Sequence, residues 1–407
     1  MNIRDQNKLS KNQKEAVGLL CIGTFLEYFD LMLYVHMAVL INDLFFPKTD
    51  DPKMLYIYGA IAFCSSYILR PFGGLLIGWI GDKYGRKITI LITSFSMAVA
   101  CLVMSTVPTY EKIGIAATFI VTGCRMVQGF SSMGEITGAY VYITESLKSP
   151  ERYSIVTVIA AFNRFGSLFA LIIAYIAIVS QFEWRIAFLL GSGIAMIGFY
   201  ARSKLRETVE FTKHFADRPQ KSSAEFFKQL KDINKVKVMI SYFIISFPAT
   251  IWTYFAYLDA PIFMKKVFKF NTEQVLLHNM LVVFMSALII ILFSFLLKKI
   301  HPLKLNSFKL IVIVVMLPII PYYLDNINHP LILMAFQILL ISFFPSGSGY
   351  LDSMCSKYFK ISTRFSNIGF LFGSAHSLGY IISSFSLIYL REIFGNYGFV
   401  IYVVPVM

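Results

Sequence analysis

The stretch GWIGDKYGRKITIL, residues 78–91, joins two long apolar segments through a short, strongly basic turn. Gly85 can adopt backbone conformations that other residues avoid, so the chain can reverse sharply there. Asp82 can accept hydrogen bonds from free backbone N–H groups or pair with a basic side chain. Arg86 and Lys87 are expected in the lipid headgroup region, because long basic side chains reach for the membrane interface. This pattern predicts a tight turn between two membrane-spanning helices.

Long apolar segments continue on both sides of this turn and account for most of the chain. Hydrophobic residues occupy 57% of the 407 positions and charged residues 15%, which is too little charge to cover a soluble protein of this size. Apolar segments of about 20 residues are typical of membrane-spanning helices. The sequence therefore predicts an all-α integral membrane protein. Twelve spans are expected, near residues 16–41, 55–80, 88–107, 113–142, 154–180, 184–201, 238–260, 275–297, 308–324, 331–352, 366–390 and 397–407.

Basic residues are distributed unequally between the two sides of the predicted membrane. If the N-terminus lies inside the cell, cytoplasmic segments hold 26 of the 37 Lys and Arg residues and the opposite side holds 8. The cytoplasmic loops of membrane proteins carry such an excess. Both termini are therefore expected in the cytoplasm. The net charge of +14 follows from this topology and does not indicate a nucleic-acid partner.

A polar, basic segment divides the predicted spans into two groups of six. We expect an N-terminal six-helix bundle over residues 1–201, a cytoplasmic linker over 202–237 and a C-terminal six-helix bundle over 238–407. Two such halves are typical of secondary transporters, which bind their solute near the middle of the membrane, between the halves. The last span would be only about 16 Å long at ~1.5 Å per residue, so we expect a truncated twelfth helix.

The basic turn also has a spacing that is typical of a known family. Gly78, Asp82, Gly85, Arg86 and Lys87 form the pattern G-x3-D-x2-G-R-K. This pattern resembles the signature between the second and third helices of the major facilitator superfamily. The resemblance implies a fold of twelve helices in a 6+6 arrangement. It also implies that this loop steadies the outward-open form of a transporter.

Four further stretches narrow the resemblance to one branch of that superfamily. They are GTFLEYFDLMLY (23–34), RPFGGLLIGWIGDKYGRK (70–87), RMVQGFSSMGE (125–135) and EWRIAF (183–188). Together they are similar to the metabolite:proton symporters, a branch that includes bacterial proline/betaine transporters and carboxylate carriers. The resemblance implies a multi-pass protein of the bacterial inner membrane, embedded in the lipid bilayer, that carries a small organic solute together with protons.

The second half of the chain departs from the pattern of that branch. KKIHPLKLNSFK, residues 298–309, lacks the Asp and Gly that the superfamily often repeats between its eighth and ninth helices. In SKYFKISTRFS, residues 356–366, Lys357 and Lys360 stand at the apparent Glu and Pro positions, although Arg364 is kept. These departures leave open a non-transporting remnant or sensor that has kept the fold.

Two carboxylates stand in the otherwise uncharged first span. Glu27 and Asp30 are three residues apart and share a helix face, which Tyr34 extends. An ionised carboxylate in hydrocarbon costs at least a few kcal/mol, so such residues are functional candidates by default. Two carboxylates on one turn repel each other when both are ionised, which favours a proton on one of them. The symporter branch has acidic residues at the positions of Glu27, Asp30 and Glu135, and the resemblance therefore implies that these three couple transport to protons.

Other polar residues within the spans are candidates for solute binding. At ~1.5 Å per residue, Glu27, Glu135 and Arg164 reach similar depths and are expected to converge, whereas Arg125 lies nearer the outer side. Arg164 would suit a solute that bears a carboxylate, a zwitterion included. His376 could instead carry a proton, or it could be a hydrogen-bonded packing residue. For all the buried charges, the alternative is a purely structural role in holding the helices together. We expect solute contacts from Tyr34, Arg125, Gln128, Arg164 and His376.

The function expected from these residues is proton-coupled uptake of a small organic solute. An osmoprotectant such as proline or glycine betaine is the leading solute, and a mono- or dicarboxylate is the alternative. The fifth span has only Gly166 where drug exporters carry repeated glycines, so import is favoured over export.

The motifs HExxH and GxSxG and the P-loop are absent, so no enzyme activity is expected. The five cysteines form no CxxC pair, and we expect a monomer with neither a metal nor an organic cofactor.

Overall fold

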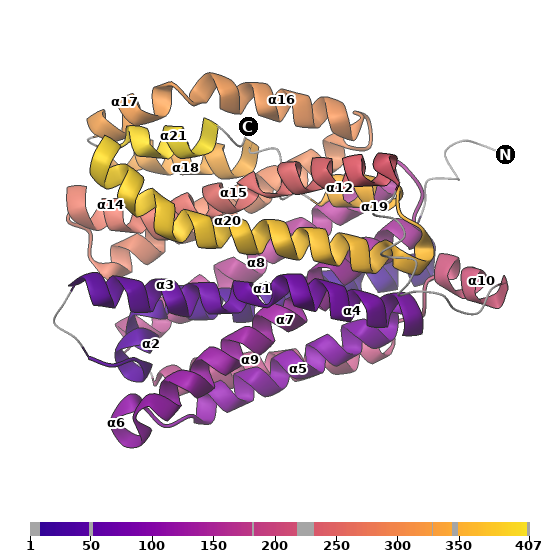
Figure 1. Ribbon diagram of the computed structural model, residues 1–407, viewed down its shortest axis with the longest axis horizontal. Coiled ribbons are helices and arrows are strands. Elements are labelled where there is room, and N and C mark those ends of the chain that lie inside the picture. The colour runs from indigo at the N-terminus through magenta and orange to yellow at the C-terminus, as the bar shows by residue number, and fades with distance from the viewer. Residues whose placement is uncertain are drawn as a thin grey trace.

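The chain folds into long helices joined by short turns. Within the ranges that the structure describes it contains no strand, and the predicted all-α fold is confirmed. The long helices lie side by side along the longest axis of the molecule (Figure 1). A computed structural model describes residues 9–48, 52–180, 183–217, 232–327, 329–343 and 349–404.

The helices of the first half cover the predicted spans closely. The span predicted at 55–80 is split into two helices around Leu69, because Pro71 has no backbone N–H to donate and disfavours helical geometry just before it. Part of the predicted linker, residues 218–231, lies outside the described residues. The helices are α1 (Lys11–His36), α2 (Ala38–Phe45), α3 (Pro52–Ile68), α4 (Arg70–Tyr84), α5 (Arg86–Thr106), α6 (Tyr110–Ile113), α7 (Ile115–Ser146), α8 (Glu151–Val179), α9 (Trp184–Ser203) and α10 (Val209–Asp217).

Prolines also break the spans of the second half. Pro248 begins a new helix after Phe247, and the two helices that meet at Pro318 are bent by 55°. The elements are α12 (Ile233–Ser246), α13 (Pro248–Tyr254), the π-helical turn η1 (Phe255–Asp259), α14 (Ala260–Val267), α15 (Thr272–Leu296), α16 (Pro302–Met316), α17 (Ile319–Asn326), α18 (Pro330–Phe343), α19 (Tyr350–Ser356), the 3-10 turn η2 (Ile361–Thr363), α20 (Arg364–Phe394) and α21 (Tyr397–Val403).

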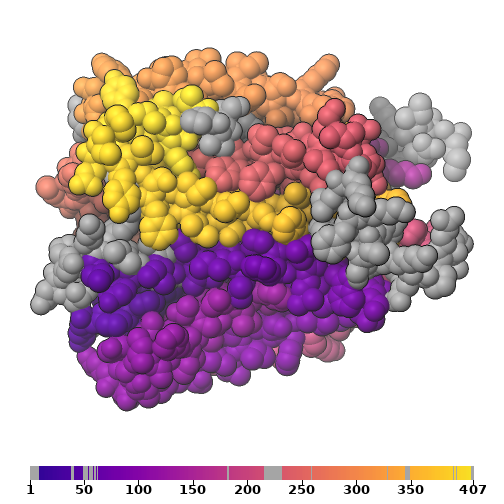
Figure 2. Space-filling view, in the orientation of Figure 1, coloured from indigo at the N-terminus to yellow at the C-terminus, as the bar shows by residue number. Residues whose placement is uncertain are grey.

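The two halves meet along their length. Figure 2 shows α20, in yellow, lying directly against the indigo helices of the first half. Glycines bring α4 and α20 into backbone contact: a Cβ on Gly74 would lie 2.1 Å from the carbonyl oxygen of Gly369. A Cβ on Gly78 would lie 2.5 Å from the Cα of Ser366. Farther round the molecule, α8 packs along α15. Side chains at these glycines would therefore separate the halves.

Apolar side chains cover the outer faces of the helices. Phe119 is 70% exposed and Ile197 is 69% exposed. Apolar surface on this scale would promote aggregation in water, whereas lipid tails cover it in a membrane. Eight of the described helices are long and apolar enough to cross a membrane, and nine if the bent pair α16–α17 counts as one span. The chain is therefore a multi-pass membrane protein.

One end of the molecule collects the turns that are rich in basic residues. At this end, which we call the basic end, α1 begins, α4 turns into α5, and α9 is followed by α10; it lies on the right in Figure 1. Gly85 makes the turn between α4 and α5 with a φ of 114°, a conformation that costs glycine little. The sharp reversal that the sequence predicts at this residue is therefore present.

Candidate transport site

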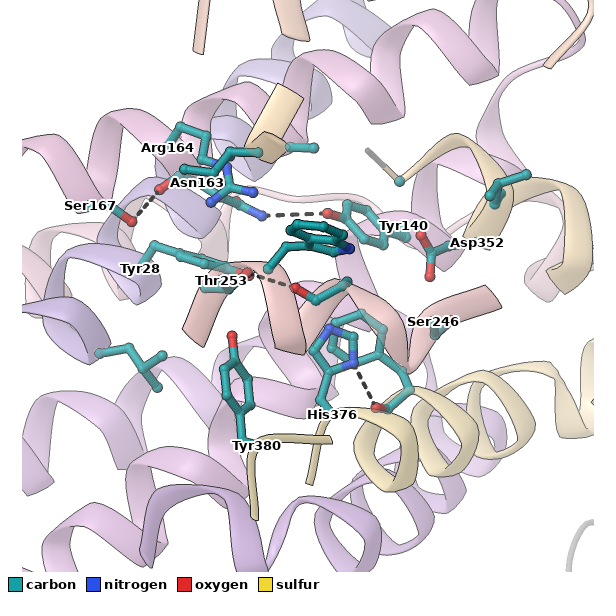
Figure 3. Close-up of a pocket in the computed structure, with 18 of the residues that line it drawn as sticks. Tyr28, Tyr140, Asn163, Arg164, Ser167, Ser246, Thr253, Asp352, His376 and Tyr380 are labelled. Carbon is teal, nitrogen blue, oxygen red and sulfur yellow. Dashed lines mark hydrogen bonds between the residues drawn. The ribbon is translucent and has the colours of Figure 1, made fainter. Parts of the chain in front are cut away.

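A cavity lies between the two halves, about midway along the helices. It holds about 1090 Å³ of empty space, part of it open to solvent. Residues of α1, α3, α4, α7 and α8 line it from the first half, and residues of α12, α13, η1, α18, α19 and α20 line it from the second half. Figure 3 shows several of these side chains facing one another across the space. The lining is rich in aromatic rings, namely Tyr28, Tyr67, Tyr140, Trp252, Tyr257, Tyr350, Phe372 and Tyr380.

Three charged side chains line this cavity within the described part of the chain. Arg70 is 3% exposed, and its guanidinium lies 4.2 Å from the centre of the Tyr67 ring. Its Nε and Nη2 atoms have no hydrogen-bond partner. Arg164 and Asp352 lie on opposite sides of the pocket in Figure 3. Asp352 accepts a hydrogen bond from the Tyr242 hydroxyl. The cavity therefore offers both signs of charge among aromatic rings.

His376 is the second predicted solute contact, after Arg164, that lies in the cavity lining. Its Nδ1 donates a hydrogen bond of 3.0 Å to the carbonyl oxygen of Phe372, one turn earlier on α20. Its ring stacks on the Phe372 ring with centroids 3.8 Å apart. The imidazole is thus held by its own helix, with one face toward the cavity (Figure 3).

The other predicted solute contacts lie behind the cavity wall, inside the first half. Gln128 donates a hydrogen bond of 2.9 Å from Nε2 to Asp30 and accepts one of 2.9 Å from Arg125. Asp30 also accepts a hydrogen bond from Cys101. The Arg125 guanidinium lies 4.1 Å from the centre of the Tyr34 ring. Within the described lining of the cavity none of these residues appears, so their predicted contact with solute has no support from the geometry.

Glu135 has a different partner from the one predicted. Of the expected convergence of Glu27, Glu135 and Arg164, only Glu27 and Glu135 meet, in one small pocket. The placement of Arg164 with them is wrong, because Arg164 lines the cavity whereas Glu135 pairs with Arg202. Glu135 also accepts hydrogen bonds of 2.5 Å from Ser94 and 3.0 Å from Thr93. Its carboxylate is therefore fully engaged by α5 and α9.

Arg202 reaches Glu135 because α9 extends past the predicted end of its span. A residue that the charge count assigns to the cytoplasmic linker is instead 3% exposed in the last turn of α9. Its guanidinium passes over Gly23, where a Cβ would lie 2.1 Å from Nη2. The signal in the sequence is a basic residue directly after an apolar run, which positive-inside topology equally explains.

Glu27 is buried beside this pair without a hydrogen-bond partner of its own. It is 2% exposed, and neither carboxylate oxygen has a partner. Leu26, Ser94, Glu135 and Arg202 share a small pocket with it. The charges that act on it most strongly are, in order, Arg70, Glu135, Asp30 and Arg202. Among the buried carboxylates of the first half, Glu27 is thus the one whose charge the structure satisfies least.

Asp82 closes the basic end of the cavity by binding the start of α20. It lies in the last turn of α4, where it is completely buried. Its two oxygens accept hydrogen bonds of 3.0 Å from the Phe365 N–H, and of 2.9 Å and 2.7 Å from the N–H and hydroxyl of Ser366. The first N–H groups of a helix have no partner within the helix and attract negative charge. Asp82 therefore joins the first half to the second.

Arg86 is buried rather than placed among the headgroups, and that expectation is wrong. It is 0% exposed and lies 3.3 Å from Asp82 and 2.7 Å from Glu145. It also donates a hydrogen bond of 2.9 Å to the carbonyl of Ile361 in the second half. Two carboxylates offset the loss of water around its charge. Lys87 is only half-buried, and its backbone N–H donates to Glu207 at 3.2 Å.

The lysine that replaces an expected acid completes this closure. Lys357 lies 2.5 Å from Glu210 of α10, and Glu210 also lies 2.9 Å from Arg364. Arg364 in turn lies 3.0 Å from Glu145. We call Asp82, Arg86, Glu145, Glu210, Lys357 and Arg364 the gate cluster. The Arg364–Glu145 pair joins the two halves, and the pairs of Glu210 with Lys357 and Arg364 join the linker to the second half. Lys357 therefore still takes part in ion pairing, although with a positive charge in place of the expected acid.

Two packed helical halves around a central cavity, closed at one end by ion pairs, define a secondary transporter. The sequence model of the Major Facilitator Superfamily matches residues 20–397, and the chain belongs to this family. The members of this family are membrane transporters. Members of the family bind small-molecule solutes within the membrane.

Two similar proteins are named as transporters. The Proline/betaine transporter of Escherichia coli (strain K12) is 32% identical over 225 residues, which are 53% of this chain and 43% of that protein. A Staphylococcus aureus (strain COL) protein that is provisionally named for the same transport is 30% identical over 273 residues, 64% of this chain and 57% of that protein. The chain thus spans about half the length of the curated relatives that it matches.

A solved structure supports the fold. The proton:xylose symporter XylE, bound to 6-bromo-6-deoxy-D-glucose, matches with a TM-score of 0.77 at 15% identity, over 97% of this chain and 93% of that one. The predicted major facilitator fold is confirmed by this match and by the family match.

Proposed function

We propose that this protein takes up a small organic solute together with protons across a bacterial inner membrane, with its basic end in the cytoplasm. A zwitterion such as proline or glycine betaine is the leading solute, and a mono- or dicarboxylate is the alternative. The transport is coupled to protons and uses no cofactor. The observation that carries the proposal is the carboxylate of Glu27, which is buried in the first half without a hydrogen-bond partner.

The proton is best held by Glu27. An ionised carboxylate without a partner in a dry site is costly, and protonation removes that cost. Glu135 has Arg202, Ser94 and Thr93 as partners, and Asp30 has Gln128 and Cys101. These two carboxylates thus have the hydrogen-bond partners that Glu27 lacks. Of the three predicted proton-coupling residues, Glu27 is therefore the carrier, and the other two shape its environment.

The cavity lining supports a zwitterion as the solute. An arginine can bind a carboxylate through paired N–H groups, and aromatic rings attract a quaternary or secondary ammonium. Arg164 and Asp352 lie on opposite sides of the cavity, with Trp252 and Tyr380 also in its wall. The names of the two relatives agree with this solute class. The carboxylate alternative is favoured by the second arginine, Arg70.

The gate cluster closes the cavity toward the basic end. With that end in the cytoplasm, the cavity is shut off from the cell interior in this arrangement of the halves. Binding of solute and proton would then favour release of Asp82 from the start of α20, so that the halves open toward the cytoplasm. The loop would thus stabilise the state that receives solute from outside, as the resemblance implies.

The proposal is tested by uptake into proteoliposomes. We expect radiolabelled glycine betaine to accumulate against its gradient when the lumen is made more alkaline than the outside, and a protonophore should abolish the accumulation. A sensor or remnant, the rival motivated by the altered second half, would bind solute without accumulating it. Equal entry with and without the pH gradient would contradict proton coupling.

Three solutes of matched shape separate the zwitterion from the carboxylate alternative. Glycine betaine carries both charges, 3,3-dimethylbutanoate replaces its nitrogen by carbon, and choline lacks the carboxylate. Ligand that binds only the folded state stabilises it by about 1.4 kcal/mol at ten times its Kd. We expect thermal shift of the purified protein to show stabilisation by betaine and little by either analogue. An equal shift with 3,3-dimethylbutanoate would favour the carboxylate alternative.

The orientation is tested by cysteine labelling in intact cells. Lys213 in α10 and Asn326 at the end of α17 are both exposed, at opposite ends of the molecule. In a background without the native cysteines, we expect an impermeant maleimide to label Asn326→Cys and to miss Lys213→Cys. Lys213→Cys should become reactive once the cells are permeabilised. Labelling of Lys213→Cys in intact cells would reverse the orientation inferred from the charge bias.

A further inference from the structure

Arg70 lines the solute cavity, and its charge also acts on the proton site. Its side chain lines the cavity, and its positive charge attracts an ionised Glu27, as does that of Arg202. Two of its guanidinium nitrogens, Nε and Nη2, are buried without hydrogen-bond partners. Both oxygens of Glu27 are likewise without partners. Two opposite charges thus act on each other without being joined by a hydrogen bond.

The backbone around Arg70 ties it to the contact between the halves. It is the first residue of α4, next to the break at Leu69, and Pro71 follows it. The carbonyl oxygen of Arg70 lies against Gly373 of α20, where a Cβ would approach it to 2.5 Å. A change in the position of Arg70 is therefore felt at the surface along which the two halves touch.

We propose that Arg70 links the two cargoes: its guanidinium binds the carboxylate of the solute while Glu27 holds a proton, and turns toward Glu27 when that proton leaves. This inference rests on the proposed role of Glu27 in proton coupling. The single positive charge of Arg70 can offset only one negative charge, so an ionised Glu27 and the carboxylate of the solute compete for it. Solute and proton therefore bind together, and each raises the affinity for the other by the same factor.

The other groups around Glu27 do not supply this link. Asp30 on α1 and Glu135 on α7 repel an ionised Glu27, and Arg202 on α9 is engaged by Glu135 and Ser94. Tyr28 and Tyr140 are the neutral titratable groups nearby, and both also line the cavity. On α8, Arg164 interacts instead with Tyr28 and Tyr257. Arg70 alone combines an unpaired guanidinium, a place in the cavity wall and a strong attraction to Glu27 within the described residues.

The test measures the affinity of purified protein for glycine betaine, or for succinate if betaine does not bind, between pH 5 and pH 9. In the wild type we expect Kd to rise with pH by roughly tenfold, within the 5- to 150-fold range usual for coupled sites. Glu27→Gln mimics the protonated carboxyl, so its Kd should stay low at every pH. Arg70→Gln should bind weakly at every pH, with no slope.

Arg164→Gln is the matched control, because it removes an arginine from the same cavity. We expect weaker binding with the pH slope of the wild type intact. Arg70→Lys is the second variant, in case Arg70→Gln fails to fold. Lysine keeps the positive charge but lacks the paired N–H groups of a guanidinium. It should therefore reduce both the affinity for solute and the pH dependence of Kd. A wild-type slope in Arg70→Gln or Arg70→Lys would overturn the proposal, as would pH-dependent binding by Glu27→Gln or a failure of the wild type to bind either carboxylate.

This outcome is separable from that of the proposed function. If the wild type accumulates solute under a pH gradient while Arg70→Gln keeps its slope, proton coupling stands and the role of Arg70 falls. If the wild type binds solute without proton-driven accumulation, the proposed function itself falls.

Discussion

Replacing Glu27 by glutamine should abolish proton-driven accumulation while leaving exchange of solute across the membrane. Glutamine keeps the size of the side chain but cannot take up and release a proton. For a neutral solute moved with one proton, a gradient of one pH unit drives accumulation of about tenfold. We expect the variant to equilibrate labelled glycine betaine without concentrating it. Efflux of labelled solute into unlabelled solute should continue, because exchange needs no net proton movement.

Asp30→Asn is the matched control for this variant. Asp30 lies one turn away and is equally buried, but Gln128 and Cys101 already satisfy it. An asparagine can still accept from Gln128, so we expect accumulation to persist with a loss of stability of about 1 kcal/mol. If Glu27→Gln still concentrates solute under a pH gradient, Glu27 is structural and the proton must ride on another group. Loss of accumulation in Asp30→Asn alone would assign the proton to Asp30.

Replacing Asp82 by asparagine should open the gate cluster and lower uptake several-fold. The charged carboxylate accepts three hydrogen bonds at the start of α20, and an amide can accept only through its single oxygen. Hydrogen bonds to a charged group contribute about 2 kcal/mol, so losing one shifts the balance from the closed to the open gate by about 30-fold. We expect normal expression, a lower initial rate of uptake and greater cysteine reactivity of residues on the cavity side of the gate.

Ser366→Ala removes one of the same hydrogen bonds and leaves the carboxylate in place. Its effect on uptake should be smaller than that of Asp82→Asn, because the two N–H groups still bind the charge. Unchanged initial rates in Asp82→Asn would mean that the turn serves only to reverse the chain. Equal losses in the two variants would indicate that hydroxyl bonding rather than charge controls the gate.

Much of the fold could be predicted because its signals are local. Apolar runs mark the spans, and Gly85 permits the reversal between α4 and α5. The breaks within spans follow from Pro71 and Pro248, whose effect on helices is also local. The distribution of the prolines was readable from the sequence, but which of them break a helix within the membrane depends on the neighbours that satisfy the freed backbone groups.

The pairing of buried charges could not be predicted in the same way. Arg86 is buried because Glu145 and the backbone of Ile361 reach it from 59 and 275 residues away. Arg202 meets Glu135 only because α9 continues two residues beyond the predicted span. Depth along a helix puts Glu27, Glu135 and Arg164 at one level, but the direction of each side chain around its helix decides whether they meet.

Glu27 and Asp30 show most clearly what the sequence alone cannot predict about buried charges. In the sequence they are two acids on one face of one helix, with nothing to rank them. In the structure, side chains from α5 and α7 satisfy Asp30, while Glu27 is left facing Arg70, Glu135 and Arg202. The difference arises from helices packed against α1, and it separates a proton carrier from a structural acid.

The most direct test of proton-coupled uptake is the movement of protons that the solute itself causes. Proteoliposomes with a pH-sensitive dye in the lumen and no initial gradient would receive glycine betaine on the outside. The account predicts that the lumen acidifies as labelled betaine enters, and that Glu27→Gln abolishes the acidification. Entry of betaine with no change in luminal pH, or with an alkaline change, would contradict it.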